Sequence, residues 1–79
     1  MDGDIPNIDV RDMLCAQALA VVSDAVKRRM PGEPVNVEMN SDDVRQDMVL
    51  WARRLGHRVE PLSLFILRIE RADSPAERA

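Results

Sequence analysis

The sequence predicts an α/β fold: a two-layer α/β sandwich of element order β-α-β-α-β-β, in which two helices cover one face of a four-stranded mixed sheet. Two segments alternate apolar and polar residues, two further short segments near the carboxyl terminus read as a hairpin, and two longer segments carry apolar residues at three- and four-residue spacing. Both helical segments are apolar on one side only, so they should cover the same face of the sheet. At 79 residues, 46% of them hydrophobic, the chain should form one small domain over residues 1–71.

The first strand and the first helix are expected in the amino-terminal half. Residues 5–10 alternate apolar and polar side chains, with a proline near the start, which indicates a strand at the edge of the sheet. A helix is expected from about Ala16 to Met30, where Pro31 and Gly32 end it. Its buried side is predicted to consist of Leu19, Val22, Val26 and Met30.

A second strand and a second helix follow. Residues 35–39 alternate cleanly and form the predicted strand. Asn40 or Ser41 is expected to begin the helix, with two aspartates in its positive first turn, and Gly56 fits a left-handed stop. The buried side of this helix is predicted to consist of Val44, Met48, Trp51, Ala52 and Leu55.

The carboxyl-terminal part predicts a β-hairpin. Residues 57–61 form a short third strand, residues 64–71 form a fourth, and residues 61–63 are the hinge between them. Residues 72–79 are polar and are expected to be a disordered tail.

The composition argues against several classes of partner. The chain has one tryptophan, one phenylalanine and no tyrosine, which disfavours a platform for stacking nucleic-acid bases. Its net charge of −3 argues against a partner held mainly through phosphates. Two basic runs, residues 27–29 and residues 53–54, still leave a weak contact with tRNA open.

Nothing in the sequence predicts a membrane segment or an oxidising compartment. No window approaches the ~20 apolar residues that span a bilayer, and the first residues carry no signal-peptide pattern. A single cysteine cannot form an internal disulfide. We therefore expect a cytoplasmic protein without membrane association.

Cys15 is the only cysteine and the side chain best suited to covalent chemistry. It lies where an extended segment gives way to an alanine-rich helix, so free backbone N–H groups and the helix dipole should favour its thiolate. Such a thiolate could take up and give away sulfane sulfur by thiol exchange. The alternative is a small packed residue, because free cysteine is among the most buried residue types. Arg11 is the second candidate, since its charge would lower the thiol pKa.

The other titratable or aromatic candidates favour structural roles. One histidine and one cysteine cannot supply the four ligands of a structural zinc site, so no metal and no cofactor is predicted. His57 is expected at the surface or at the start of a strand. Asp47 is expected to be structural or solvated, and Trp51, one turn later, is expected in the core.

Several segments resemble the TusA-like, or SirA-like, family of sulfur carriers. They are residues 8–11, the helix that begins near Cys15, residues 31–33 before a strand, and residues 47–57. The resemblance spans residues 8–71, and the predicted elements follow that family's order. Members of the family typically carry sulfur as a persulfide on the cysteine of an Arg-Gly-Leu-x-Cys-Pro-x-Pro motif.

That motif is only partly present in this chain. Cys15 matches its cysteine, and Arg11 matches its leading arginine. Asp12 stands where the family has glycine, and Ala16 and Ala18 stand where it has the two prolines. Proline suits the first turn of a helix. Aspartate accepts a positive φ less easily than glycine and adds a negative charge near the thiol.

The resemblance implies a small sulfur carrier that relays sulfane sulfur as a persulfide on Cys15. Its partners would be a cysteine-desulfurase-type donor and a downstream acceptor protein, in tRNA thiolation or other sulfur metabolism. It would act as a sulfurtransferase only if Cys15 is reactive. The alternative is a non-catalytic interaction or regulatory module that keeps the fold without the chemistry, and the substitutions Asp12, Ala16 and Ala18 favour it.

Overall fold

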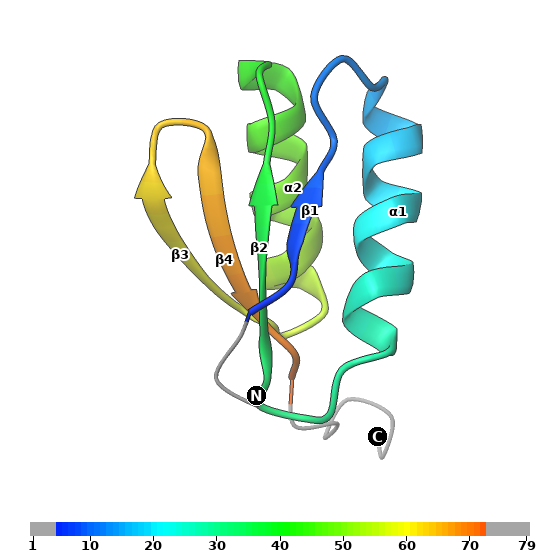
Figure 1. Cartoon of the computed structure of the whole chain (residues 1–79), viewed down its shortest axis with the longest axis vertical. Coiled ribbons are helices and arrows are strands. Elements are labelled where there is room, and N and C mark those ends of the chain that lie inside the picture. Colours follow the sequence, from blue (N-terminus) through cyan, green and yellow to red (C-terminus); the bar gives the residue numbers. More distant parts are fainter. Residues whose placement is uncertain (1–4, 73–79) are drawn as a thin grey trace.

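Two helices and a four-stranded sheet make up the structure, a computed structural model that describes residues 5–72 (Figure 1). Both helices lie on one side of the sheet, so the predicted α/β fold is confirmed. In chain order the elements are β1 Asn7–Asp9, α1 Cys15–Lys27, β2 Pro34–Glu38, α2 Asp42–Arg54, β3 Arg58–Ser63 and β4 Ile66–Glu70.

The direction of the strands decides where the helices begin. The sheet order is β1-β2-β4-β3, with β1 parallel to β2 and with β4 antiparallel to both β2 and β3. Strands β1, β2 and β3 therefore point the same way, and the chain must cross over from the end of one to the start of the next. Helices α1 and α2 make these crossovers, so both begin at the same end of the sheet (Figure 1).

One aliphatic layer between the helices and the sheet forms the core. Alternate residues of the two central strands face the helices, and side chains from one stripe of each helix pack against them. Among the described residues, no polar or charged side chain is buried. The buried side chains are Val10, Ala18, Val22, Val26, Val35, Val37, Met39, Val44, Met48, Ala52, Leu67 and Ile69.

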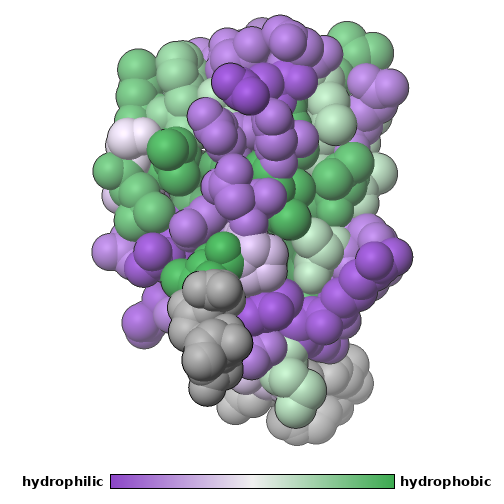
Figure 2. Space-filling view, viewed as in Figure 1, coloured by the Kyte–Doolittle hydropathy of each residue, from purple (hydrophilic) through white to green (hydrophobic). Residues whose placement is uncertain are grey.

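The opposite face of the sheet is polar. The guanidinium Nε of Arg68 donates to Oδ1 of Asn36 across the two central strands, at 3.1 Å. Glu60 lies directly opposite Arg68 in the register, and Arg58 lies opposite Glu70, so charges of opposite sign are neighbours. Figure 2 shows hydrophilic residues along the middle of this face. The helices pack their apolar sides against only one face of the sheet, so that face is buried and the polar face stays exposed.

Helix α1 is shorter than the sequence predicts. It begins at Cys15 instead of Ala16 and ends at Lys27 instead of Met30, whose side chain is 66% exposed and does not belong to the core. The residue before a proline is disfavoured in a helix, which explains why Met30, directly before Pro31, lies outside α1. The side chain of Arg71 also donates hydrogen bonds to the carbonyl oxygens of Lys27 and Arg29, and these contacts satisfy the end of the helix.

The predicted hinge of the hairpin is wrong. Strand β3 runs through Pro61 to Ser63, with a register irregularity between these two residues, and the turn is formed by Leu64 and Phe65. Strand β4 consequently begins at Ile66, two residues later than expected. Proline is tolerated within β3 because this strand lies at the edge of the sheet.

The signals at the ends of α2 were predicted correctly. Ser41 is the N-cap, and its hydroxyl accepts from the N–H of Val44 at 3.4 Å. Gly56 follows the helix with a φ of 83°. Two residues of the predicted buried stripe differ: Leu55 is the C-cap and 44% exposed, and Trp51 is only partly buried at the edge of the core.

The two ends of the described chain also differ from expectation. Strand β1 comprises residues 7–9 instead of 5–10. The expected tail began at residue 72, but the N–H of Ala72 donates to Nδ1 of His57 at 2.7 Å. Residues 73–79 lie outside the described part of the chain. Neither α1 nor α2 is long and apolar enough to cross a membrane.

Met48 and Leu50 allow a direct test of the core on one helix. Met48 is fully buried, whereas Leu50 is 58% exposed on the same helix. Met48→Ala should lower the free energy of unfolding by about 2–5 kcal/mol, because it leaves a cavity in the core. Leu50→Ala should change it by only about 0.5 kcal/mol. Urea denaturation of the two variants measures both values, and similar losses would contradict this assignment of the core.

Candidate functional site

Cys15 is the first residue of α1, and its side chain is partly exposed. Leu14 precedes it as the N-cap in an extended conformation, and its hydrocarbon side chain provides no acceptor for the first turn. The first turn of α1 also contains no acidic residue. Helix α2 differs, since Ser41 caps it and two aspartates lie in its first turn. The first-turn N–H groups of α1 therefore remain available near the sulfur atom.

A pair of reciprocal hydrogen bonds holds the starts of the two helices together. The N–H of Asp12 donates to Oδ1 of Asn40 at 2.9 Å, and Nδ2 of Asn40 donates to Oδ1 of Asp12 at 2.8 Å. Asp12 has a φ of 66°, a left-handed conformation that aspartate adopts more readily than most residues. Asp12 thus has a positive φ and connects the loop before α1 to the loop before α2.

The pKa of the Cys15 thiol is raised, not lowered. The main cause is the Asp47 carboxylate, which favours the protonated thiol, and burial adds to this effect. The charges of Asp47 and Asp43 raise the pKa further. The backbone N–H of Cys15 lowers it, as the position at the helix start predicts, but this contribution is smaller. The expectation of a depressed thiol pKa is therefore wrong.

Arg11 is engaged elsewhere. Its Nε donates to Oδ1 of Asp9 and its Nη2 to Oδ2, both at 3.0 Å, and the Asp9 oxygen also accepts from the Arg11 backbone N–H. Hydrogen bonding to Arg11 lowers the pKa of the Asp9 carboxyl to about 2. Arg11 is not among the groups that shift the pKa of Cys15, so the stabilising role expected for it has no support in this geometry.

For Asp47, reasoning from the sequence preferred a structural or solvated role to a functional one. The residue is exposed, but it also acts on the thiol 32 residues earlier in the chain. A usable signal was present in the predicted topology. Two crossover helices on one face of a sheet begin at the same end of its strands. This topology places the first turns of α2 near Cys15.

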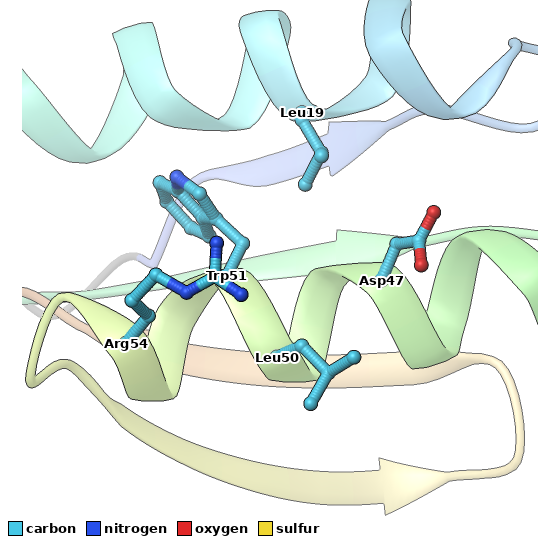
Figure 3. A pocket seen from close by; sticks show the side chains of 5 residues that line it. All are labelled: Leu19, Asp47, Leu50, Trp51 and Arg54. Atoms are coloured by element: carbon cyan, nitrogen blue, oxygen red, sulfur yellow. The ribbon is translucent and has the colours of Figure 1, made fainter.

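A shallow groove runs between α1 and α2, and we call it the interhelical groove. It has a volume of about 210 Å³. In Figure 3, Leu19 extends from α1 toward α2, while Trp51 and Asp47 extend from α2 toward α1. The residues that line the groove are Leu19, Asp47, Leu50, Trp51 and Arg54.

The basic runs lie at the far end of the molecule from Cys15, where both helices end (Figure 1). Arg28 pairs with Asp24 at 3.0 Å, and Arg29 approaches Glu33 at 3.5 Å, so part of their charge is neutralised. Lys27 and the two arginines at the end of α2 complement the negative ends of the helix dipoles. This arrangement gives a tRNA contact no particular support.

Comparison of the chain with models of protein families, with curated proteins and with solved structures finds no match. Within residues 5–72, no three histidine, cysteine, aspartate or glutamate side chains lie close enough to hold a metal ion. The site consists of the Cys15 thiol, the open first turn of α1, and the Asp47 carboxylate.

Asp47→Asn should lower the pKa of Cys15. An amide removes the negative charge that opposes the thiolate. The rate of alkylation by iodoacetamide, measured against pH, should therefore reach its midpoint at a lower pH than in the unmodified chain. Asp43→Asn should give a smaller shift in the same direction. Asp24→Asn, a matched change at the pair with Arg28, should give none, and an equal shift there would contradict the role of Asp47.

His57 should make the fold sensitive to mild acid. Its pKa is lowered by burial and by the charge of Arg71, and its Nδ1 accepts the N–H of Ala72. Because the unfolded chain binds a proton first, stability should be complete above about pH 6.5 and decline as the pH falls through the depressed pKa. His57→Gln should remove this decline in thermal melts. The tilted contact of its ring with Trp51, at a centroid distance of 5.4 Å, should make Trp51 fluorescence follow the same titration.

Proposed function

We propose that this protein is a small sulfur carrier in which Cys15 receives sulfane sulfur from a donor protein and passes it to an acceptor. The observation that carries the proposal is the position of the thiol: it is partly exposed, at the first residue of a helix whose N-cap residue, Leu14, has no side chain that can accept from the first-turn N–H groups. The donor would be of the cysteine-desulfurase type, and the acceptor would belong to tRNA thiolation or another thiolation pathway.

The transfer needs two thiol exchanges at one atom. In the first, the Cys15 thiolate attacks the outer sulfur of the donor's persulfide. A new S–S bond forms, the donor's S–S bond breaks, and the donor leaves as a thiolate that takes up the proton lost by Cys15. In the second, an acceptor thiolate attacks the outer sulfur now on Cys15, and Cys15 leaves as a thiolate. The electron pairs balance, so no external oxidant is required.

The geometry suits the loaded form better than the empty form. In the empty protein, Asp47 raises the pKa of Cys15 and so favours the neutral thiol. A persulfide is a stronger acid than the corresponding thiol, so its outer sulfur ionises more readily. The uncapped N–H groups of Cys15 and Ala16 can donate to that anion, as the first turns of helices do to bound anions.

A second candidate is the interaction or regulatory module without sulfur chemistry. The raised pKa of Cys15 favours it, because a neutral thiol is a poor nucleophile. Arg11 favours it too, since its guanidinium is held by Asp9 and supplies no charge to the sulfur. In that case Cys15→Ser would leave the binding function of the protein unchanged.

Intact-mass measurement separates the two functions. The protein is incubated with a cysteine desulfurase and free cysteine, or with inorganic polysulfide. A carrier should gain about 32 Da, one sulfur atom, and should lose this adduct on treatment with a reducing thiol.

Cys15→Ser is the control, since it removes the acceptor atom at a partly exposed position with little effect on the core. The variant should show no added mass. If the unmodified chain also gains no mass, or if the gain persists in Cys15→Ser, the carrier function is rejected in favour of the module.

A further inference from the structure

The interhelical groove leads to the thiol. Leu19, which lines the groove, lies one helical turn after Cys15 on α1. Asp47 lines the same groove and is also the main cause of the raised pKa of Cys15. A side chain placed in the groove would therefore be adjacent to the carboxylate that controls the sulfur atom.

The size and lining of the groove fit side chains of another protein. Its volume of about 210 Å³ is below the range of roughly 300–1,000 Å³ that is typical of small-molecule pockets. Leu50 is 58% exposed at its border, and Trp51, a residue type enriched at the centres of interfaces, forms part of its wall. One or two apolar side chains would fill it.

The groove has a charge at each end. Asp47 lies at the end near Cys15 and Arg54 at the other, two turns further along α2, which corresponds to about 10 Å. Within residues 5–72, neither side chain has a salt-bridge partner. The complementary occupant carries a cation at the Cys15 end, an apolar side chain in the middle, and an anion at the far end.

We propose that the interhelical groove binds an extended segment of the partner that exchanges sulfur with Cys15, with a lysine or arginine against Asp47, an apolar residue between Leu50 and Trp51, and a carboxylate against Arg54. This inference rests on the proposed function for the identity of the partner. In an extended segment every second side chain points to the same face, so the three contacts require residues at positions i, i+2 and i+4.

Docking would then activate the thiol. A cation against Asp47 neutralises the negative charge that opposes the thiolate, so Cys15 becomes a better nucleophile when the partner is bound. The free carrier keeps an unreactive thiol, and the partner supplies the missing positive charge that Arg11, held by Asp9, does not provide.

Disulfide exchange with two peptides of identical composition tests the proposal. The matched peptide is Cys-Gly-Lys-Ser-Leu-Ser-Glu and the control peptide is Cys-Gly-Glu-Ser-Leu-Ser-Lys, each as the mixed disulfide with thionitrobenzoate. The peptide cysteine fixes which end meets Cys15. The matched peptide should release thionitrobenzoate roughly tenfold faster, since two favourable charge contacts replace two unfavourable ones.

Variants assign the preference to the groove. Arg54→Glu should bring the ratio of the two peptide rates close to one. It should leave unchanged the rate at which Cys15 reacts with a thionitrobenzoate disulfide that carries no peptide. Leu50→Ala should slow the matched peptide toward the control. Saturable quenching or enhancement of Trp51 fluorescence by the matched peptide, in the Cys15→Ser variant, should report binding without any chemistry, because Trp51 is the only tryptophan.

Three results would overturn the docking proposal. The first is an equal rate for both peptides, and the second is a preference that Arg54→Glu leaves intact. The third is a dimer in solution that Leu50→Ala converts to a monomer, since the groove would then hold a second copy of the chain. Exchange and fluorescence need only a thiol and a groove, so they fail or succeed independently of the persulfide assay.

Discussion

The parallel direction of β1, β2 and β3 is the constraint on which the candidate site depends. Because of it, both helices cross back over one face of the sheet and begin at the same end of the strands. The start of α1, with its thiol, then lies beside the first turns of α2, with their carboxylates. Asp43 stabilises α2 through its position in the positive first turn. The same charge opposes ionisation of Cys15, so the fold itself sets the resting state of the sulfur.

The two helices differ in how their first turns are capped, and this difference affects the surroundings of Cys15. Ser41 caps α2, whereas Leu14, which is 73% exposed, cannot cap α1. A serine or aspartate in place of Leu14 would be expected to stabilise the helix by about 1 kcal/mol. It would also occupy the first-turn N–H groups that lie near the sulfur atom of Cys15. Local stability is lower at the start of α1 than it could be, which is typical of positions where a binding or reactive group has to be accommodated.

The parts of the fold that could be predicted from the sequence depend on local rules. Alternation located the first two strands, and Ser41 and Gly56 fixed the ends of α2, because caps act on residues within one turn. Pro61 misplaced the hairpin, since only the sheet order reveals that β3 is an edge strand that tolerates proline. Met30 continued the apolar spacing of α1, so the helix was predicted to end too late. Its carbonyl oxygens near the true end accept hydrogen bonds from Arg71, which lies 42 residues or more away in the sequence.

For the candidate site too, local sequence predicts one part and only the tertiary structure reveals the other. The position of Cys15 at a helix start follows from local sequence, but its pKa depends on Asp47, which only the tertiary structure brings near. Because Asp47 lines the interhelical groove and raises the pKa of Cys15, a cation bound in the groove beside Asp47 would favour the thiolate. A cation that favours the thiolate must itself bind more tightly once the thiolate or persulfide anion has formed. Such reciprocity would hold a donor in place while sulfur is being transferred. It would also leave the free protein with a thiol that resists alkylation and oxidation, since susceptibility to both follows thiolate character.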